Sequence, residues 1–336
     1  MERPAFSIIG CQHGHLIRLM DDLLGMGYRC TGIYEEAGED MMLARLLANR
    51  YDVPLLGHIA EALTHDVRLV GCAAVNSRKI GIAELCEERG KAIMFDKPAV
   101  TCRDGLDRLG GIVGRGRIEV GMLLTQRFGP AVYTLKQLLD EGALGRLLSL
   151  GIRKPHRLSA DGRPRWFFDR ELSGGIIQDL LVHDLDLLRW LTNGEIADCQ
   201  GYLVKRTMPE HPGFYDVAQL NVRMESGAIA QLYADWHTPE RHWTWGDGRI
   251  FAVGTAGTAE LRLQGDPLIA RGAMLLMSEP SGELRSVPLR QAPVGVTGDF
   301  LNRLEGLPSA LTGADIWAAS RAAVEADERA ERICCV

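Results

Sequence analysis

The chain has 336 residues, of which 46% are hydrophobic and 24% charged, so it is an ordinary globular protein long enough for two domains. Its formal net charge of -6 is modest and its Lys and Arg residues form no runs, which argues against a nucleic-acid partner or an anionic membrane surface. No apolar run reaches the length of a membrane span and no secretory leader is recognised, so a cytoplasmic protein with a small-molecule ligand is expected.

The eight cysteines show neither a CxxC pair nor a His/Cys cluster with zinc spacing. They are Cys11, Cys30, Cys72, Cys86, Cys102, Cys199, Cys334 and Cys335. We therefore expect free thiols in a reducing compartment and no metal site.

The first third of the chain alternates short apolar runs with amphipathic stretches. Strands are predicted at 5–10, 29–35, 68–75, 91–96 and 117–124, and helices at 15–27, 39–52, 79–90 and 103–113. This alternation indicates right-handed crossovers and a parallel sheet with helices on both faces. Residues 1–124 are predicted to form a doubly wound α/β domain.

The pattern changes in the remaining two thirds. Helices are predicted at 129–145, 173–190 and 313–333, and strands at 146–154, 197–206, 216–225, 227–236, 249–255, 258–263 and 273–278. Neighbouring strands separated by turn residues favour a mostly antiparallel sheet. Residues 125–336 are predicted to form an α+β domain with an open sheet.

The turn after the first strand reads "GCQHGH", from Gly10 to His15. A dinucleotide fold needs a tight strand-to-helix turn here, and Gly10 stands where the first fingerprint glycine belongs. Gln12 and His15 occupy the next two glycine positions, so the fingerprint is degenerate, and Gly14 is expected to relieve packing one position early. His13 and His15 either face a phosphate or solvate the turn. An ordinary turn remains the alternative.

Glu35 ends the second predicted strand, about 25 residues beyond Gly10. An acid there can accept both ribose hydroxyls and repel a 2′-phosphate, so NAD is preferred, with NADP as the alternative. Glu36 is a competing candidate, and a plain surface acid is the alternative to both.

Two further segments carry ionisable residues of catalytic type. In "FDKPAV", Pro98 restricts the backbone so that Lys97 can point to a ligand at the end of a parallel strand. In "SGGIIQDLLVHDLDLLRW", Asp179, His183 and Asp186 are spaced to share one face of a helix. A histidine beside a carboxylate suits general acid/base chemistry. The alternatives are an ordinary loop and a solvated polar face.

Taken together, several motifs resemble the Gfo/Idh/MocA family, which includes glucose-fructose oxidoreductase and inositol dehydrogenase. They are Gly10, Asn76 in "AAVNSRK", "DKP" at 96–98, "QRFGPAVYTLKQLLDEGALG" at 126–145 and "SGGIIQDLLVHDLDLLRWLTNG" at 173–194. The resemblance implies a Rossmann domain that binds NAD or NADP. It also implies hydride transfer between nicotinamide and a secondary alcohol or ketone of a sugar, cyclic polyol or sugar acid. A homo-oligomer, either dimer or tetramer, is expected by the same resemblance.

Site residues follow from this resemblance. Lys97 would hold the reacting oxygen, His183 would be the general acid/base, and Asp179 would orient the substrate or His183. Asp186 is expected to be structural. The predicted cofactor ligands are Gly10, Gln12, His13, Gly14, Glu35, Asn76 and Lys97, and the predicted substrate ligands are Lys97, Arg127, Lys154, His156, Trp166, Asp179 and His183.

The sequence departs from the family pattern at Asp96, where glutamate is commoner, at Lys79, where histidine is frequent, and at Val75, which replaces a proline. The basic segment 153–165 gives a mild preference for an acidic sugar, with solvated loop charges as the alternative. Two other functions stay open: a relative that uses tightly held NAD to cleave glycosides without net redox change, and a sugar- or dinucleotide-sensing regulator. The regulator should lack the lysine, aspartate or histidine of the motifs, and all three are present.

Overall fold

The computed structural model describes residues 3–280 and 282–335 and divides into two compact units. Unit 1 comprises the described residues of Met1–Leu123 with Pro164–Gly175 and Val294–Arg321. Unit 2 comprises Leu124–Arg163, Ile176–Pro293 and the described residues of Ala322–Val336. The domain boundary that the sequence predicts after residue 124 stays a prediction.

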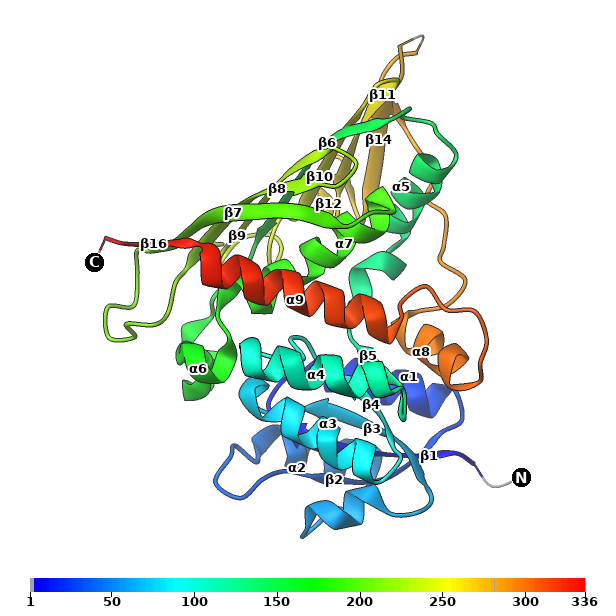
Figure 1. The fold of residues 1–336 in the computed structure, drawn as a ribbon, viewed down its shortest axis with the longest axis vertical. Helices are drawn as coiled ribbons and strands as arrows, with labels where there is room; N and C mark the ends of the chain where they lie inside the picture. Colours follow the sequence, from blue (N-terminus) through cyan, green and yellow to red (C-terminus); the bar gives the residue numbers. More distant parts are fainter. Residues whose placement is uncertain (1–2, 281, 336) are drawn as a thin grey trace. The chain divides into compact units, whose positions relative to one another are not determined.

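Unit 1 contains a parallel five-stranded sheet of order β2-β1-β3-β4-β5. The strands are β1 (Ala5–Cys11), β2 (Arg29–Tyr34), β3 (Val67–Ala73), β4 (Ala92–Phe95) and β5 (Val120–Met122). Its helices are α1 (Leu16–Gly25), α2 (Met42–Tyr51), α3 (Lys79–Glu88), α4 (Arg103–Arg115), α6 (Arg170–Ser173) and α8 (Val296–Leu304). The predicted doubly wound α/β fold is confirmed (Figure 1). The strand order reverses between β1 and β3, which is where such sheets bind ligands.

The apolar pattern of the sequence explains this sheet. Every residue of β1 is buried, as expected for a central strand covered on both faces. In α1 the buried residues Leu16, Leu19 and Leu23 recur every three to four positions, so one stripe of the helix faces the core. Short 3-10 helices, η1 (Ile59–Leu63), η2 (Asn76–Arg78) and η5 (Arg165–Phe168), complete the unit.

Unit 2 contains a nine-stranded sheet of order β15-β14-β11-β10-β6-β9-β8-β7-β16. The strands are β6 (Leu147–Pro155), β7 (Ile196–Lys205), β8 (Val217–Met224), β9 (Ile229–Asp235), β10 (Arg249–Gly254), β11 (Gly257–Arg262), β14 (Met274–Ser278), β15 (Arg285–Ser286) and β16 (Glu331–Cys334). Only the β6–β9 and β7–β16 pairs of this sheet are parallel. The mostly antiparallel α+β arrangement is therefore confirmed. A separate hairpin joins β12 (Gly265–Asp266) and β13 (Ala270–Arg271).

One face of this sheet is covered by helices. In β8, Ala218, Leu220 and Val222 are buried while the residues between them are exposed, the alternation of a sheet with one solvated face. The helix α5 (Pro130–Asp140) contacts β11 and β14, and α7 (Val182–Thr192) contacts β6 (Figure 1). Short 3-10 helices η3 (Thr125–Phe128) and η4 (Ala160–Gly162) precede them.

Three details differ from the sequence prediction. The predicted helix at 173–190 is not one α-helix, because Ile177–Leu181 forms a π-helical turn, η6, ahead of α7. The last predicted helix, α9 (Gly313–Arg329), ends before 333, because Glu331–Cys334 pairs with β7 as β16. The helix α8 was not predicted at all. Within the described residues, no helix is both long and apolar enough to cross a bilayer.

Candidate active site

The turn after β1 requires glycine at its first position. Gly10 has a φ of +79°, and a Cβ there would lie 2.4 Å from the Cα of Ala74 at the end of β3. The turn continues with a hydrogen bond from the Gln12 N–H to the Ala73 carbonyl at 2.8 Å. The expectation for Gly14 is wrong, because a Cβ at this position would meet nothing within 4 Å. Gly10 alone thus provides the close approach that the fingerprint demands.

Glu35 is buried at the end of β2 and binds this turn. Its Oε2 accepts hydrogen bonds from the Cys11 N–H at 2.5 Å and the Gln12 side-chain amide at 2.8 Å. Its Oε1 accepts one from the Glu36 N–H at 3.0 Å. Burial raises the pKa of Glu35, and the hydrogen bonds from Cys11 and Gln12 oppose that rise. Glu35 therefore fixes the shape of the dinucleotide-type turn, a role that was not predicted from the sequence, and its predicted contact with the ribose hydroxyls stays a prediction.

A pocket of about 490 Å³ opens beside Glu35. It is lined by apolar residues from the ends of β1 and β3 and from α3, among them Ile9, Val75 and Ile80. The charged residues of its lining are Glu35, Glu36, Glu39, Arg78 and Arg108. The Arg78 guanidinium lies 2.5 Å from Glu36 Oε2 and 2.8 Å from Glu39 Oε1. A largely apolar lining with a few polar groups is typical of a small-molecule site.

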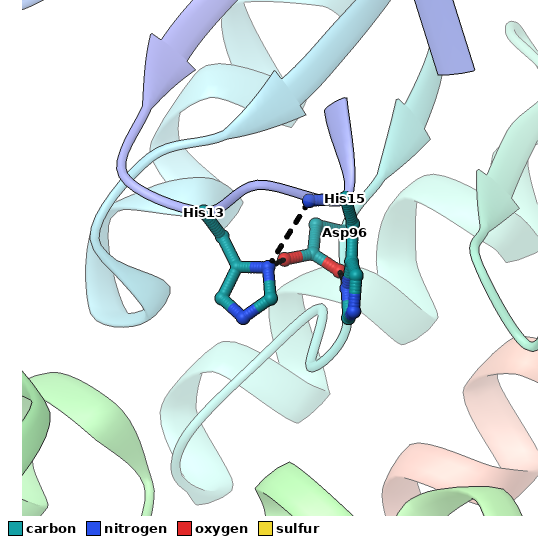
Figure 2. Close-up of side chains that lie close together, drawn as sticks. All are labelled: His13, His15 and Asp96. Carbon is teal, nitrogen blue, oxygen red and sulfur yellow. Dashed lines mark hydrogen bonds and ion pairs between the residues drawn. The ribbon is translucent and has the colours of Figure 1, made fainter. Parts of the chain in front are cut away.

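The residue that follows β4, Asp96, lies against both histidines of the turn. Figure 2 shows the two imidazole rings converging on its carboxylate. His15 Nδ1 is 2.7 Å from Asp96 Oδ1, and His13 Nδ1 is 3.3 Å from Oδ2. Although burial opposes ionisation, His13 and His15 hold the pKa of Asp96 well below its usual range. This cluster was not predicted, because Asp96 lies 81 positions from His15 in the sequence.

Lys97 lies in a loop whose backbone carbonyls accept hydrogen bonds from a second lysine, Lys79. Lys79 is fully buried, and its ammonium donates to the carbonyls of Asp96 at 2.7 Å and of Pro98 at 3.1 Å. It also lies 3.4 Å from the Lys97 carbonyl. Lys97 itself is buried. Lys79 was noticed only as a departure from the family pattern, and its role in fixing this loop was missed.

Asn76 and Trp166, both predicted to contact ligands, lie in unit 1. Asn76 is buried in η2 and donates from its side-chain amide to the Ser173 carbonyl at 2.9 Å. The Trp166 ring packs edge-on against Phe167 in η5. Its indole N–H is buried and has no acceptor among the residues that the structure describes. Asn76 is thus engaged by the chain, and the ligand contact expected of Trp166 stays a prediction.

The segment 173–190 carries Asp179 and His183, the predicted acid-base residues, and both lie in unit 2. Asp179 lies in the π-helical turn η6 and is buried, and His183 lies in the first turn of α7 and is half-buried. Isolated π-helical turns are rare and occur frequently at functional sites. Burial lowers the pKa of Arg163, and the nearby carboxylate of Asp179 opposes this. The π-helical turn is wider than an α-helical one. It therefore changes the spacing from which Asp179, His183 and Asp186 were predicted to share one face of a helix.

Two other carboxylates of α7, those of Asp184 and Asp186, form buried ion pairs. Arg127 binds Asp186 through two hydrogen bonds, Nε to Oδ2 at 2.7 Å and an Nη to Oδ1 at 2.5 Å. Lys154 pairs with Asp184, and both side chains are buried. Burial raises the pKa of Asp184, which the Lys154 charge opposes. The structural role expected for Asp186 agrees with its pair, and Asp184 was not singled out from the sequence.

Most basic residues of the segment 153–165 are bound within unit 2. Arg157 donates to the carbonyls of His242 and Thr244 and stacks on a tryptophan ring. Arg163 donates to the Leu158 carbonyl and lies over the Trp236 ring. The His156 ring packs edge-on against the same tryptophan. This segment is therefore chiefly a structural layer of aromatic and basic groups.

Comparison with known proteins finds a family model that matches part of the chain and several similar dehydrogenases. Residues 132–260 match the family model described as the GFO/IDH/MocA C-terminal domain. The chain is 29% identical over 170 residues to inositol 2-dehydrogenase 2 of Saccharopolyspora erythraea, covering 50% of this chain and 47% of that one. It is 27% identical over 174 residues to scyllo-inositol 2-dehydrogenase (NAD(+)) of Bacillus subtilis, covering 51% and 48%. The chain thus spans about half the length of these relatives.

A solved structure matches almost the whole chain. Levoglucosan dehydrogenase in complex with NADH and levoglucosan superposes with a TM-score of 0.81 over 98% of this chain and 97% of that one. At 20% identity this likeness shows the fold alone.

Proposed function

We propose that this chain is a member of the Gfo/Idh/MocA family and a nicotinamide-dependent oxidoreductase acting on a secondary alcohol of a sugar or cyclic polyol. One observation carries the proposal within this chain. The β1 turn crosses the end of β3 at Gly10, at the strand-order reversal, and is anchored there by Glu35. The names of the two inositol dehydrogenases support the chemistry.

NAD is the proposed cofactor. The pocket beside Glu35 carries three carboxylates, Glu35, Glu36 and Glu39, and these disfavour a 2′-phosphate by charge. Arg78 offers a positive charge there, but it pairs with Glu36 and Glu39. Removal of those two acids therefore improves NADP binding. Gly10, Gln12, His13, Gly14 and Asn76 are proposed to surround the dinucleotide with Glu35.

Three residues are proposed to bind the reacting alcohol and to remove its proton. Lys97 holds the reacting oxygen, His183 takes its proton as general base, and Asp179 orients the substrate or His183. The bound nicotinamide supplies the hydride acceptor, so the protein has only to align the two carbons and move one proton. The loop contacts of Lys79 support a fixed position for Lys97.

A neutral polyol or sugar is the proposed substrate class. Arg127 and Lys154, two predicted substrate ligands, are bound in buried pairs with carboxylates of α7. Arg157 is bound to backbone carbonyls. With these charges engaged, little remains in the described basic segment to hold an acidic group, which weakens the mild preference for acidic sugars.

The test begins with titration of NAD and NADP into the purified protein. It continues with NADH appearance against inositols, neutral hexoses and sugar acids. Glu35→Gln is compared with Glu88→Gln, which changes an exposed acid of unit 1 outside the pocket lining and serves as the matched control. We expect NAD to bind more tightly than NADP, Glu35→Gln alone to lose affinity, and a neutral polyol to be oxidised. Absence of binding of either nucleotide contradicts the proposal.

We also propose that the protein forms a homo-oligomer and acts in a reducing compartment such as the cytoplasm. Eight free cysteines support such a compartment. The uncovered face of the nine-stranded sheet exposes Tyr202, Ile229, Phe251 and Val253. We expect Phe251→Glu to lower the mass measured by light scattering, while Leu46→Glu on the exposed surface of α2 leaves it unchanged. Equal masses contradict burial of this face.

A further inference from the structure

We propose that His13, His15 and Asp96 form a binding site for a divalent transition-metal ion, a property that goes beyond the proposed oxidoreductase activity and shares His13 with the proposed dinucleotide site. One potential ligand atom of each residue lies within 4.8 Å of the other two. The histidines belong to the β1–α1 turn, and Asp96 directly follows β4. Parallel strands thus bring Asp96, which lies 81 positions from His15 in the sequence, against the two histidines of this turn (Figure 2).

The distances suit a metal ion of ordinary size. Two metal–ligand bonds of about 2.1 Å at a tetrahedral angle place their ligand atoms roughly 3.4 Å apart. His13 Nδ1 and Asp96 Oδ2 are 3.3 Å apart, close to that separation. His15 Nδ1 and Asp96 Oδ1 are 2.7 Å apart and have to open by several tenths of an ångström. The His15 side chain is 48% exposed, so it has room to rotate.

Both imidazole rings present to the carboxylate a nitrogen that a metal ion could bind. The Nδ1 atom of each ring lies within 3.3 Å of an Asp96 carboxylate oxygen. Figure 2 shows both rings with Nδ1 toward Asp96 and Nε2 pointing away.

The ligand types restrict the ion. Two imidazole nitrogens and one carboxylate oxygen suit Zn²⁺, Co²⁺ or Ni²⁺, whereas Ca²⁺ and Mg²⁺ prefer oxygen ligands alone. The Asp96 side chain is only 2% exposed, so it forms the floor of the site, and the half-exposed histidines leave an approach from solvent. We infer three protein ligands with at least one position open to water.

The test is a titration of the full chain with Co²⁺, followed by its visible ligand-field absorption, and displacement by Zn²⁺. It is carried out without nucleotide, so its outcome is independent of whether NAD binds. Cys102, Cys334 and Cys335 are exposed and could bind the same metals, so all variants are made in a background with these three changed to serine. His15→Ala and His13→Ala are compared with His65→Ala, an exposed histidine of the same unit.

We expect one equivalent of Co²⁺ in the parent and in His65→Ala. Loss of one ligand should weaken binding by at least the 10- to 100-fold that loss of an outer-sphere partner costs. Asp96→Asn should do the same. Because Asp96 is buried, circular dichroism checks that this variant folds, and the exposed His15 keeps the test decisive if it does not. Wild-type affinity in both histidine variants, or no binding of Co²⁺ or Zn²⁺ by the parent, overturns the proposal.

Discussion

The two units hold the buried cations near their candidate residues in different ways. In unit 1, Lys79 donates to backbone carbonyls of the loop that carries Lys97. In unit 2, Arg127 and Lys154 pair with carboxylates of α7. Carbonyl contacts fix the shape of a loop, whereas ion pairs fix a helix to its neighbours. A basic residue near a candidate site can therefore stabilise a loop or attach a helix to its neighbours. The residue type alone does not show which of these two roles it has.

The strongest test of this comparison is the removal of Arg127. Arg127→Met leaves the Asp186 carboxylate buried without its bidentate partner, so the free energy of unfolding should fall by about 3–5 kcal/mol. Urea unfolding measures the loss. The double variant Arg127→Met/Asp186→Leu removes the charge as well and should recover most of the stability. A single variant as stable as the parent would show that the pair contributes nothing.

Unit 1 offers a matched pair of buried lysines. Lys79→Met removes the donor to the Lys97 loop and should cost about 2–3 kcal/mol, the scale of a hydrogen bond to a charged group. Lys91 also donates to three carbonyls, those of Thr64, His65 and Val67, away from that loop. Lys91→Met should destabilise the protein comparably.

Only Lys79→Met should also lower kcat in NADH formation measured well below the unfolding midpoint. Equal kcat values for the two variants would mean that Lys79 supports stability without positioning Lys97.

The two glycines of the turn provide a smaller contrast. Gly10→Ala introduces a Cβ against the Ala74 backbone at a positive φ and should destabilise by roughly 1–3 kcal/mol. It should also weaken NAD binding, because the turn has to shift. Gly14→Ala meets open space and should change stability by no more than about 1 kcal/mol. Thermal melting and NAD titration distinguish them, and a neutral Gly10→Ala would contradict the close approach.

The smallest expected effect is the pH dependence contributed by Glu35. Because burial raises its pKa in the folded state, Glu35 contributes stability that is fully present below its unfolded pKa and is lost as pH rises through the folded value. The stability of the wild type relative to Glu35→Gln should therefore be higher at about pH 4 than at pH 7. Urea midpoints at the two pH values measure this, and an opposite trend would mean that the hydrogen bonds from Cys11 and Gln12 outweigh burial.

The sequence predicted what depends on local patterns. The α/β alternation, the glycine turn at Gly10 and the acid at Glu35 all follow from short-range spacing. The π-helical turn was missed because Ile177–Leu181 has the apolar pattern of an ordinary helix. β16 was missed because Glu331 and Arg332 continue the charged composition of α9.

Contacts between distant residues could not be predicted. Arg127 and Asp186 are 59 positions apart, and Lys79 lies 17 positions before the Asp96 carbonyl that it binds. Their side chains meet only because packing brings their elements together, so a single sequence carries no spacing signal for them. The predicted substrate roles of Arg127 and Lys154 rested on residue type, which does not reveal a buried partner.

The most direct test of the proposed function is single-turnover NADH formation by His183→Ala, compared with His65→Ala and the wild type on a neutral polyol. We predict a loss of roughly 10²-fold or more in His183→Ala, the scale of a lost general base, with NAD affinity unchanged in both variants. Turnover by His183→Ala equal to that of His65→Ala would contradict the assignment of the acid-base role.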